Sequence, residues 1–185
     1  MNDESALLKA AKKLNSDALV AIFDEYATAI YTYALRLCRD PIEADHIVGD
    51  VFDQLMEKLA TGQGPIANLR SYLYQIAYHV IVDRAPHNPR YAPLETVTDL
   101  HDISKNPAIQ SQTEDQAIRE TLLVSVNNEL SEIQTHVIIL RFLEKFSIRE
   151  TAAIVGKKAN NVKVIQNRGI AKLRSCLGFQ TENYG

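Results

Sequence analysis

Apolar residues recur at every third or fourth position along most of this chain, and this spacing constrains the fold more than any other feature. The segment from Ala44 to Leu59 shows it most clearly, because its apolar residues fall on one continuous stripe of a helix. The apolar–polar alternation of a β-strand is nearly absent. We therefore expect an all-α protein. The predicted helices cover residues 17–39, 43–59, 69–84, 114–128, 132–145, 148–155 and 159–176.

The helical pattern stops between residues 86 and 112, where four of the six prolines lie among Asn, Asp, Ser and Thr. This composition predicts an extended linker between two small helical domains. Charge divides unevenly as well: residues 1–91 carry −3, residues 92–130 carry −5 and residues 131–185 carry +5. A basic C-terminal part is typical of anion binding. The expected units are a domain over 1–85, the linker over 86–112, a domain over 113–177 and a tail over 178–185.

Helix start and stop signals are frequent in the C-terminal domain. Capping-box spacings begin at Thr113, Ser131 and Ser147, and each precedes an apolar periodic run. Gly156 stands where a helix-ending residue of positive φ is expected. Two short helices joined by a tight glycine turn, over residues 148–155 and 159–176, are typical of a helix-turn-helix.

The second of these helices carries cations and amides without any acid. Lysine and arginine can contact phosphates or guanine, and asparagine can contact adenine in a major groove. The alternative is a solvated basic helix packed on a small bundle. The candidate duplex-binding residues are Lys158, Asn160, Asn161, Lys163, Val164, Asn167, Arg168 and Lys172.

At this point the sequence resembles a known family. The stretch "LSEIQTHVIILRFLEKFSIRETAAIVGKKANNVKVIQNRGIAKLRSCL" resembles the promoter-binding domain of bacterial RNA polymerase sigma factors. The stretch "AIFDEYATAIYTYALRLCRDPIEADHIVGDVFDQLMEKL" resembles their N-terminal core domain. Two such domains with only a linker between them match the extracytoplasmic-function group. The resemblance implies partners: core RNA polymerase, promoter DNA and an anti-sigma factor or other inhibitor. It implies no enzymatic activity and no cofactor.

The resemblance also implies roles for N-terminal residues. An acidic helix face would contact the largest polymerase subunits, although the ordinary alternative is a solvated face. A loop and the following helix would bind the opened −10 element, with aromatics stacking on bases. Helical spacing cannot place Tyr72, Tyr74 and Tyr78 on one face, so we expect at least one in the core. The polymerase candidates are Asp45, Asp50, Asp53 and Glu57. The −10 candidates are Gln63, Asn68, Arg70, Tyr72, Gln75, His79 and Arg84.

Some positions depart from the family pattern. His46 replaces an acid and Gly49 replaces a glutamine on the polymerase-facing helix, which predicts a weaker or pH-sensitive contact. Tyr72 and His79 stand where tryptophan and asparagine are common, so we expect a different promoter sequence. The acidic linker could cover the basic helix in the free protein or could simply be disordered.

Other functions remain open from the residues. The main alternative is a helix-turn-helix regulator with a helical ligand-binding or dimerisation domain, independent of polymerase. A third interpretation uses Glu43-x-x-His46, the spacing of helical di-metal sites, but no second copy exists. Cys38 and Cys176 lie far apart without a metal-binding motif, so we expect no metal. No apolar run or leader predicts membrane insertion or export, and we expect a cytoplasmic protein.

Overall fold

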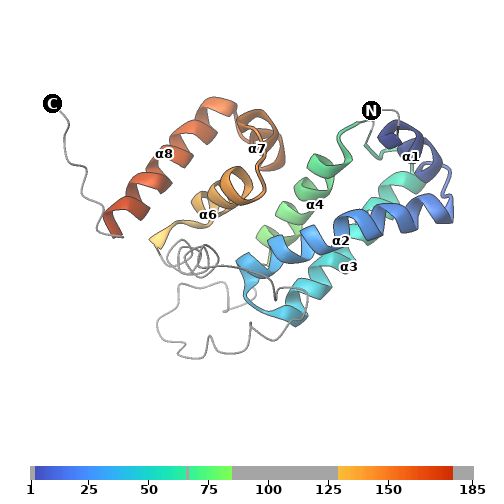
Figure 1. Cartoon of the computed structure of the whole chain (residues 1–185), viewed down its shortest axis with the longest axis horizontal. Helices are drawn as coiled ribbons and strands as arrows, with labels where there is room; N and C mark the ends of the chain where they lie inside the picture. The colour runs from blue at the N-terminus through green and yellow to red at the C-terminus, as the bar shows by residue number, and fades with distance from the viewer. Residues whose placement is uncertain (1–2, 66, 85–128, 177–185) are drawn as a thin grey trace.

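The structure is a computed structural model of the whole chain, and it describes residues 3–65, 67–84 and 129–176. Figure 1 shows that these residues form two bundles of helices, and the all-α prediction is confirmed for them. The predicted linker and the predicted helix over 114–128 lie outside the described residues.

The N-terminal bundle consists of four helices. They are α1 (Asp3–Ala11), α2 (Ser16–Cys38), α3 (Pro41–Ala60) and α4 (Leu69–Arg84). Helix α2 packs against both α3 and α4, and the bounds of these three helices agree with the predictions to within two residues. Asp40 caps α3 as expected, since its Oδ1 accepts a hydrogen bond from the Ile42 backbone N–H at 3.0 Å.

Helix α1 is an element that was not predicted from the sequence. It buries Leu8 and Ala11 against the rest of the bundle. Its Glu4 carboxylate accepts a hydrogen bond from the backbone N–H of Leu69 at 2.7 Å, at the first residue of α4. A carboxylate at this position satisfies an N–H that the helix itself cannot, and it complements the helix dipole. Helix α1 therefore fixes the start of α4.

The C-terminal bundle consists of α6 (Glu132–Ile138), the π-helical turn η5 (Ile139–Leu143), α7 (Ile148–Ile154) and α8 (Ala159–Cys176). The sequence predicted one helix over 132–145, and the structure changes to π geometry after Ile138. The Glu144 backbone N–H accordingly bonds to the Ile139 carbonyl at 3.0 Å, five residues back. Such wide turns often occur at functional positions.

The predicted helix-turn-helix is present. Ser147 and Glu150 form a capping box, with hydrogen bonds of 2.8 and 3.2 Å between each side chain and the other's backbone N–H. Gly156 follows α7 and has a φ of +63°. Glycine is the residue that most readily adopts this backbone conformation at the end of a helix. A Cβ on Gly169 of α8 would lie 3.3 Å from the Ile138 side chain, so this glycine lets α8 pack closely on α6.

The two bundles pack against each other. Helix α7 contacts α4, Figure 1 shows the C-terminal bundle beside α4, and buried residues of both bundles form one continuous core. Phe146, which follows η5, meets the Tyr74 ring edge-on with 4.8 Å between ring centroids. We call this arrangement the docked state.

Candidate nucleic-acid interface

Helix α8 presents its predicted duplex-binding residues to solvent. All eight candidates are exposed, and Val164 keeps 48% of its surface accessible. On the opposite side, Val162 and Gly169 are buried against the bundle. Lys172 is partly engaged, because its ammonium donates a hydrogen bond to the Glu129 carbonyl at 2.6 Å. The exposed face offers cations, amides and one apolar side chain, which suits the edges and phosphates of a DNA groove.

Helix α4 and the loop before it form a second candidate surface. Gln63, Asn68 and His79 are exposed, whereas Tyr72 and Gln75 are half-buried. Asn68 has φ of +57°, and its side chain accepts a hydrogen bond from the Ser71 backbone N–H at 3.2 Å. The expectation that one of the three tyrosines is core is confirmed, because Tyr74 is fully buried.

Arg70, a candidate for binding single-stranded DNA, is held by the C-terminal bundle. It donates a hydrogen bond to the backbone carbonyl of Glu144 at 2.7 Å, and its guanidinium lies 3.7 Å from the Glu144 carboxylate. The guanidinium also lies over the Phe146 ring, 4.1 Å from the centroid. A carboxylate and an aromatic ring thus already contact this guanidinium, a group that pairs with anions and stacks on rings.

Glu144 is the centre of these contacts, and it was not among the residues predicted from the sequence. Its carboxylate also accepts hydrogen bonds from Arg36 of α2 at 2.6 Å and from the Tyr74 hydroxyl of α4 at 2.5 Å. Burial and the neighbouring carboxylate raise the pKa of Tyr74. We call Glu144 with Arg36, Arg70 and Tyr74 the Glu144 cluster. Its partners lie 70 to 108 residues before Glu144 in the chain, so no local pattern could reveal the cluster.

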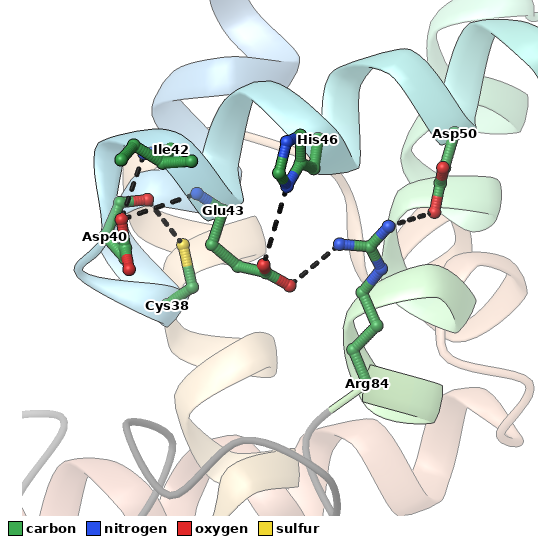
Figure 2. A network of polar contacts seen from close by, with 7 residues as sticks. All are labelled: Cys38, Asp40, Ile42, Glu43, His46, Asp50 and Arg84. Atoms are coloured by element: carbon green, nitrogen blue, oxygen red, sulfur yellow. Dashed lines mark hydrogen bonds and ion pairs between the residues drawn. The ribbon is translucent and has the colours of Figure 1, made fainter.

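A second ion-pair network ties the end of α4 to α3. Figure 2 shows Arg84 between two carboxylates: it donates to Glu43 at 2.8 Å and to Asp50. His46 Nδ1 lies 4.0 Å from the other Glu43 oxygen. Burial acts against the charge of Arg84, but the hydrogen bonds with the two carboxylates raise its pKa. A predicted DNA contact and a predicted polymerase contact, Arg84 and Asp50, therefore bind each other within the N-terminal bundle.

Asp50, Asp53 and Glu57 form an acidic stripe along α3, and Asp45 lies on another side of the helix. Asp45, Asp53 and Glu57 are exposed, and the Asp50 side chain is 44% accessible. This stripe opposes the buried residues of α3, as the sequence predicts.

Several apolar side chains on α2 and α3 are exposed, although their helical spacing puts them on the apolar faces of these helices. Val20, Phe23 and Met56 keep 58%, 47% and 39% of their surfaces accessible. Phe23 packs on Phe52 with 4.8 Å between ring centroids. We call these four residues the apolar patch. These apolar residues recur at helical spacing, and the helices form as predicted. Among the described residues, however, no neighbouring element covers this side of α2 and α3.

Metal-binding and membrane-spanning features are absent from the part of the chain that the structure describes. In the ranges 3–65, 67–84 and 129–176, no three His, Cys, Asp or Glu side chains gather where they could hold a metal ion. Within the same ranges, no helix combines the length and the apolar character that a membrane span requires. Cys38 is buried with a free thiol, and burial raises its pKa.

Comparison with known proteins gives the family. Residues 22–88 match the family model of sigma-70 region 2, and residues 128–175 match that of sigma-70 region 4. RNA polymerase sigma-E factor of Streptomyces coelicolor is 31% identical over 161 residues, which cover 84% of this chain and 85% of that protein. ECF RNA polymerase sigma factor BldN of the same organism is 21% identical, and the match spans 92% of this chain and 64% of BldN. The chain belongs to the sigma-70 family, in its extracytoplasmic-function group.

Solved structures show the same fold. CnrH, in complex with the cytosolic domain of CnrY, is 18% identical, with a TM-score of 0.70 over 96% of this chain and 99% of that chain. The sigma factor RpoE of Bartonella quintana, in complex with the anti-sigma factor NepR, is 20% identical. Its TM-score is 0.63 over 88% of this chain and 97% of that chain.

Proposed function

We propose that this protein directs core RNA polymerase to specific promoters and helps open the −10 region at the start of transcription. One observation carries the proposal: a single chain joins an acid-faced helical bundle to a helix-turn-helix whose second helix exposes cations, amides and one apolar residue at its candidate positions. The region 2 and region 4 matches fall on these two bundles in that order. The alternative, a regulator that acts without polymerase, is not favoured by these matches.

The two bundles divide the work in this proposal. In the C-terminal domain, over 113–177, helix α8 reads the −35 duplex through its exposed residues. In the N-terminal domain, over 1–85, α4 and the loop before it bind the opened −10 strand. The chain supplies binding and positioning and no catalytic group, because the polymerase makes the phosphodiester bond. Such a protein works in the cytoplasm beside the polymerase.

The polymerase contact is assigned to the acidic stripe of α3 together with the apolar patch. Asp53 and Glu57 alternate with Phe52 and Met56 along the helix. Apolar residues at the centre and charges at the rim are typical of protein interfaces. The patch gives this surface an apolar centre that the acids alone would lack.

An inhibitor protein is part of the proposal. The Bartonella quintana RpoE structure contains an anti-sigma factor, which is a partner of that protein. We propose a partner of the same kind for this chain, which would bind the polymerase-facing and DNA-facing surfaces.

Reconstituted transcription tests the function directly. The protein is mixed with bacterial core polymerase and fragments of genomic DNA, and the 5′ ends of the transcripts are mapped. We expect discrete starts that are absent with core polymerase alone and that share two upstream elements at fixed spacing. Transcript ends no different from those made by core polymerase alone would reject the proposal and favour the polymerase-independent regulator.

A further inference from the structure

A buried histidine lies where the two bundles meet. His136 of α6 is fully buried, and its Nδ1 makes a 2.7 Å hydrogen bond with the Tyr33 hydroxyl of α2. The Tyr78 ring of α4 meets the imidazole edge-on, with 4.8 Å between centroids. The imidazole therefore touches two helices of the N-terminal bundle, α2 and α4, at the face on which the C-terminal bundle docks.

The surroundings of His136 accept a neutral imidazole and oppose a charged one. In either neutral tautomer the bond to Tyr33 can form, because the hydroxyl can donate to a bare Nδ1 or accept from Nδ1–H. Nε2 is buried without a hydrogen-bond partner among the described residues. Protonation places a hydrogen on both nitrogens, so the charged Nε2–H would face the core without an acceptor. An unpaired buried charge of this kind strongly disfavours the docked state.

No nearby carboxylate compensates for the charge in the described residues. The groups that face His136 are the hydroxyl of Tyr33 on α2 and the ring of Tyr78 on α4. Glu132 on α6 acts on Tyr78, and Glu144 acts on Tyr33, but neither makes a hydrogen bond or an ion pair with His136. Tyrosines remain neutral across the physiological range, so they offer no negative charge to an imidazolium.

We propose that His136 is a proton-controlled lock between the two bundles: the neutral imidazole keeps them docked, and protonation separates them and uncovers α4. Separation would dissolve the Glu144 cluster and release Arg70. The consequence for DNA rests on the proposed function, whereas the docking equilibrium itself can be measured without polymerase or DNA.

Linkage gives the direction and the size of the effect. Burial lowers the pKa of His136 from 6.5 to about 3 in the docked state. The separated state therefore binds the proton more tightly, and docking is fully favoured only above about pH 6.5 and weakens as the pH falls towards about 3. From pH 7.5 to pH 5.5, the ratio of separated to docked molecules should rise about tenfold.

Fluorescence energy transfer in the full chain measures this ratio. Dyes are attached at the exposed positions Ala21→Cys on α2 and Ala171→Cys on α8, in a background with Cys38→Ala and Cys176→Ser so that no third thiol can be labelled. Urea is set for each variant so that half of the molecules are separated at pH 7.5 while far-UV circular dichroism is unchanged. Where the bundles separate only as the helices unfold, the urea midpoint is compared between pH 7.5 and pH 5.5 instead.

The decisive variant is the pair Tyr33→Phe with His136→Phe. It removes both polar partners together and keeps two buried rings, so no hydroxyl is left unpaired. The wild-type ratio should rise about tenfold at pH 5.5, or its midpoint should fall, while the double variant changes less than twofold. His46→Gln, at an exposed histidine, should behave as wild type. A pH-insensitive wild type, or a double variant that responds like wild type, would overturn the lock.

Discussion

Helices α8 and α4 carry the polar side chains that we propose for DNA binding, yet these side chains lie in opposite surroundings. Every candidate on α8 is exposed, whereas Arg70 of α4 is bound to Glu144 and Phe146, and Arg84 is bound to Glu43 and Asp50. The two helices therefore differ in how far their candidate side chains are already bound by other residues of the protein. In the proposed function, the surface that reads duplex DNA stays open, whereas Arg70 on the surface proposed for the single strand is held by the protein's own Glu144 and Phe146.

The largest expected effect concerns the open surface. Replacing Lys163, Asn167 and Arg168 together with alanine removes three contacts that are each worth about 1–3 kcal/mol at a base edge. Transcription from a promoter identified by start-site mapping should fall at least about a hundredfold. Binding to core polymerase, measured by fluorescence anisotropy, should stay unchanged. Lys12→Ala with Lys13→Ala, exposed at the end of α1, is the matched control. Promoter activity within threefold of wild type would show that α8 does not read DNA.

The next largest effect concerns the acidic stripe. Asp53→Lys with Glu57→Lys reverses two exposed charges without disturbing Arg84, which a change at Asp50 would do. Affinity for core polymerase should fall about thirtyfold at low salt and less at high salt, because electrostatic attraction is screened. Asp17→Lys, at the start of α2, should have little effect. Equal losses from both variants would mean that only net charge matters.

Uncovering α4 should have an intermediate effect. Glu144→Gln removes the negative charge that binds Arg36 and lies 3.7 Å from Arg70, and hydrogen bonds to charged groups are worth about 1.5–3 kcal/mol. The free protein should bind a single-stranded oligonucleotide about tenfold more tightly, while its affinity for duplex DNA changes less than threefold. Glu129→Gln removes the charge of an exposed carboxylate in the same bundle, and it therefore controls for the change in net charge. If the two variants bind single strands equally, α4 is not covered in solution.

Two glycine substitutions give the smallest expected effects, and they have opposite signs. Gly49→Ala lies within α3, where an added Cβ meets nothing within 4 Å, so the free energy of unfolding should rise by about 1 kcal/mol. Gly156→Ala must adopt φ of +63°, so it should lower that free energy by about 1 kcal/mol. Urea denaturation of each variant measures both, and changes of the same sign would contradict the assigned backbone geometry.

Local patterns in the sequence predicted most of the helices and the exposed face of α8. The capping boxes at Ser131 and Ser147 and the glycine at 156 are local signals, because each acts within one helical turn. Periodicity identified an apolar stripe on α2 and α3 but could not show that Phe23 and Met56 remain exposed.

The parts that the sequence did not reveal depend on long-range contacts. The Glu144 cluster and the His136 contact join residues 70 or more positions apart, and both depend on how the two bundles dock. Helix α1 did have a signal, in the helical spacing of Leu7, Leu8 and Ala11, although it was not among the predicted helices. Its function in capping α4 through Glu4 again required the folded arrangement.

Photocrosslinking in the open promoter complex tests the central claim most directly. A benzophenone amino acid is placed at Val164 of α8 or at Tyr72 of α4, and the crosslinked nucleotides are mapped. We expect Val164 to label duplex DNA near −35 and Tyr72 to label the unpaired strand near −10. Labelling of the same upstream duplex from both positions, or none from Tyr72, would contradict the division of labour between the two bundles.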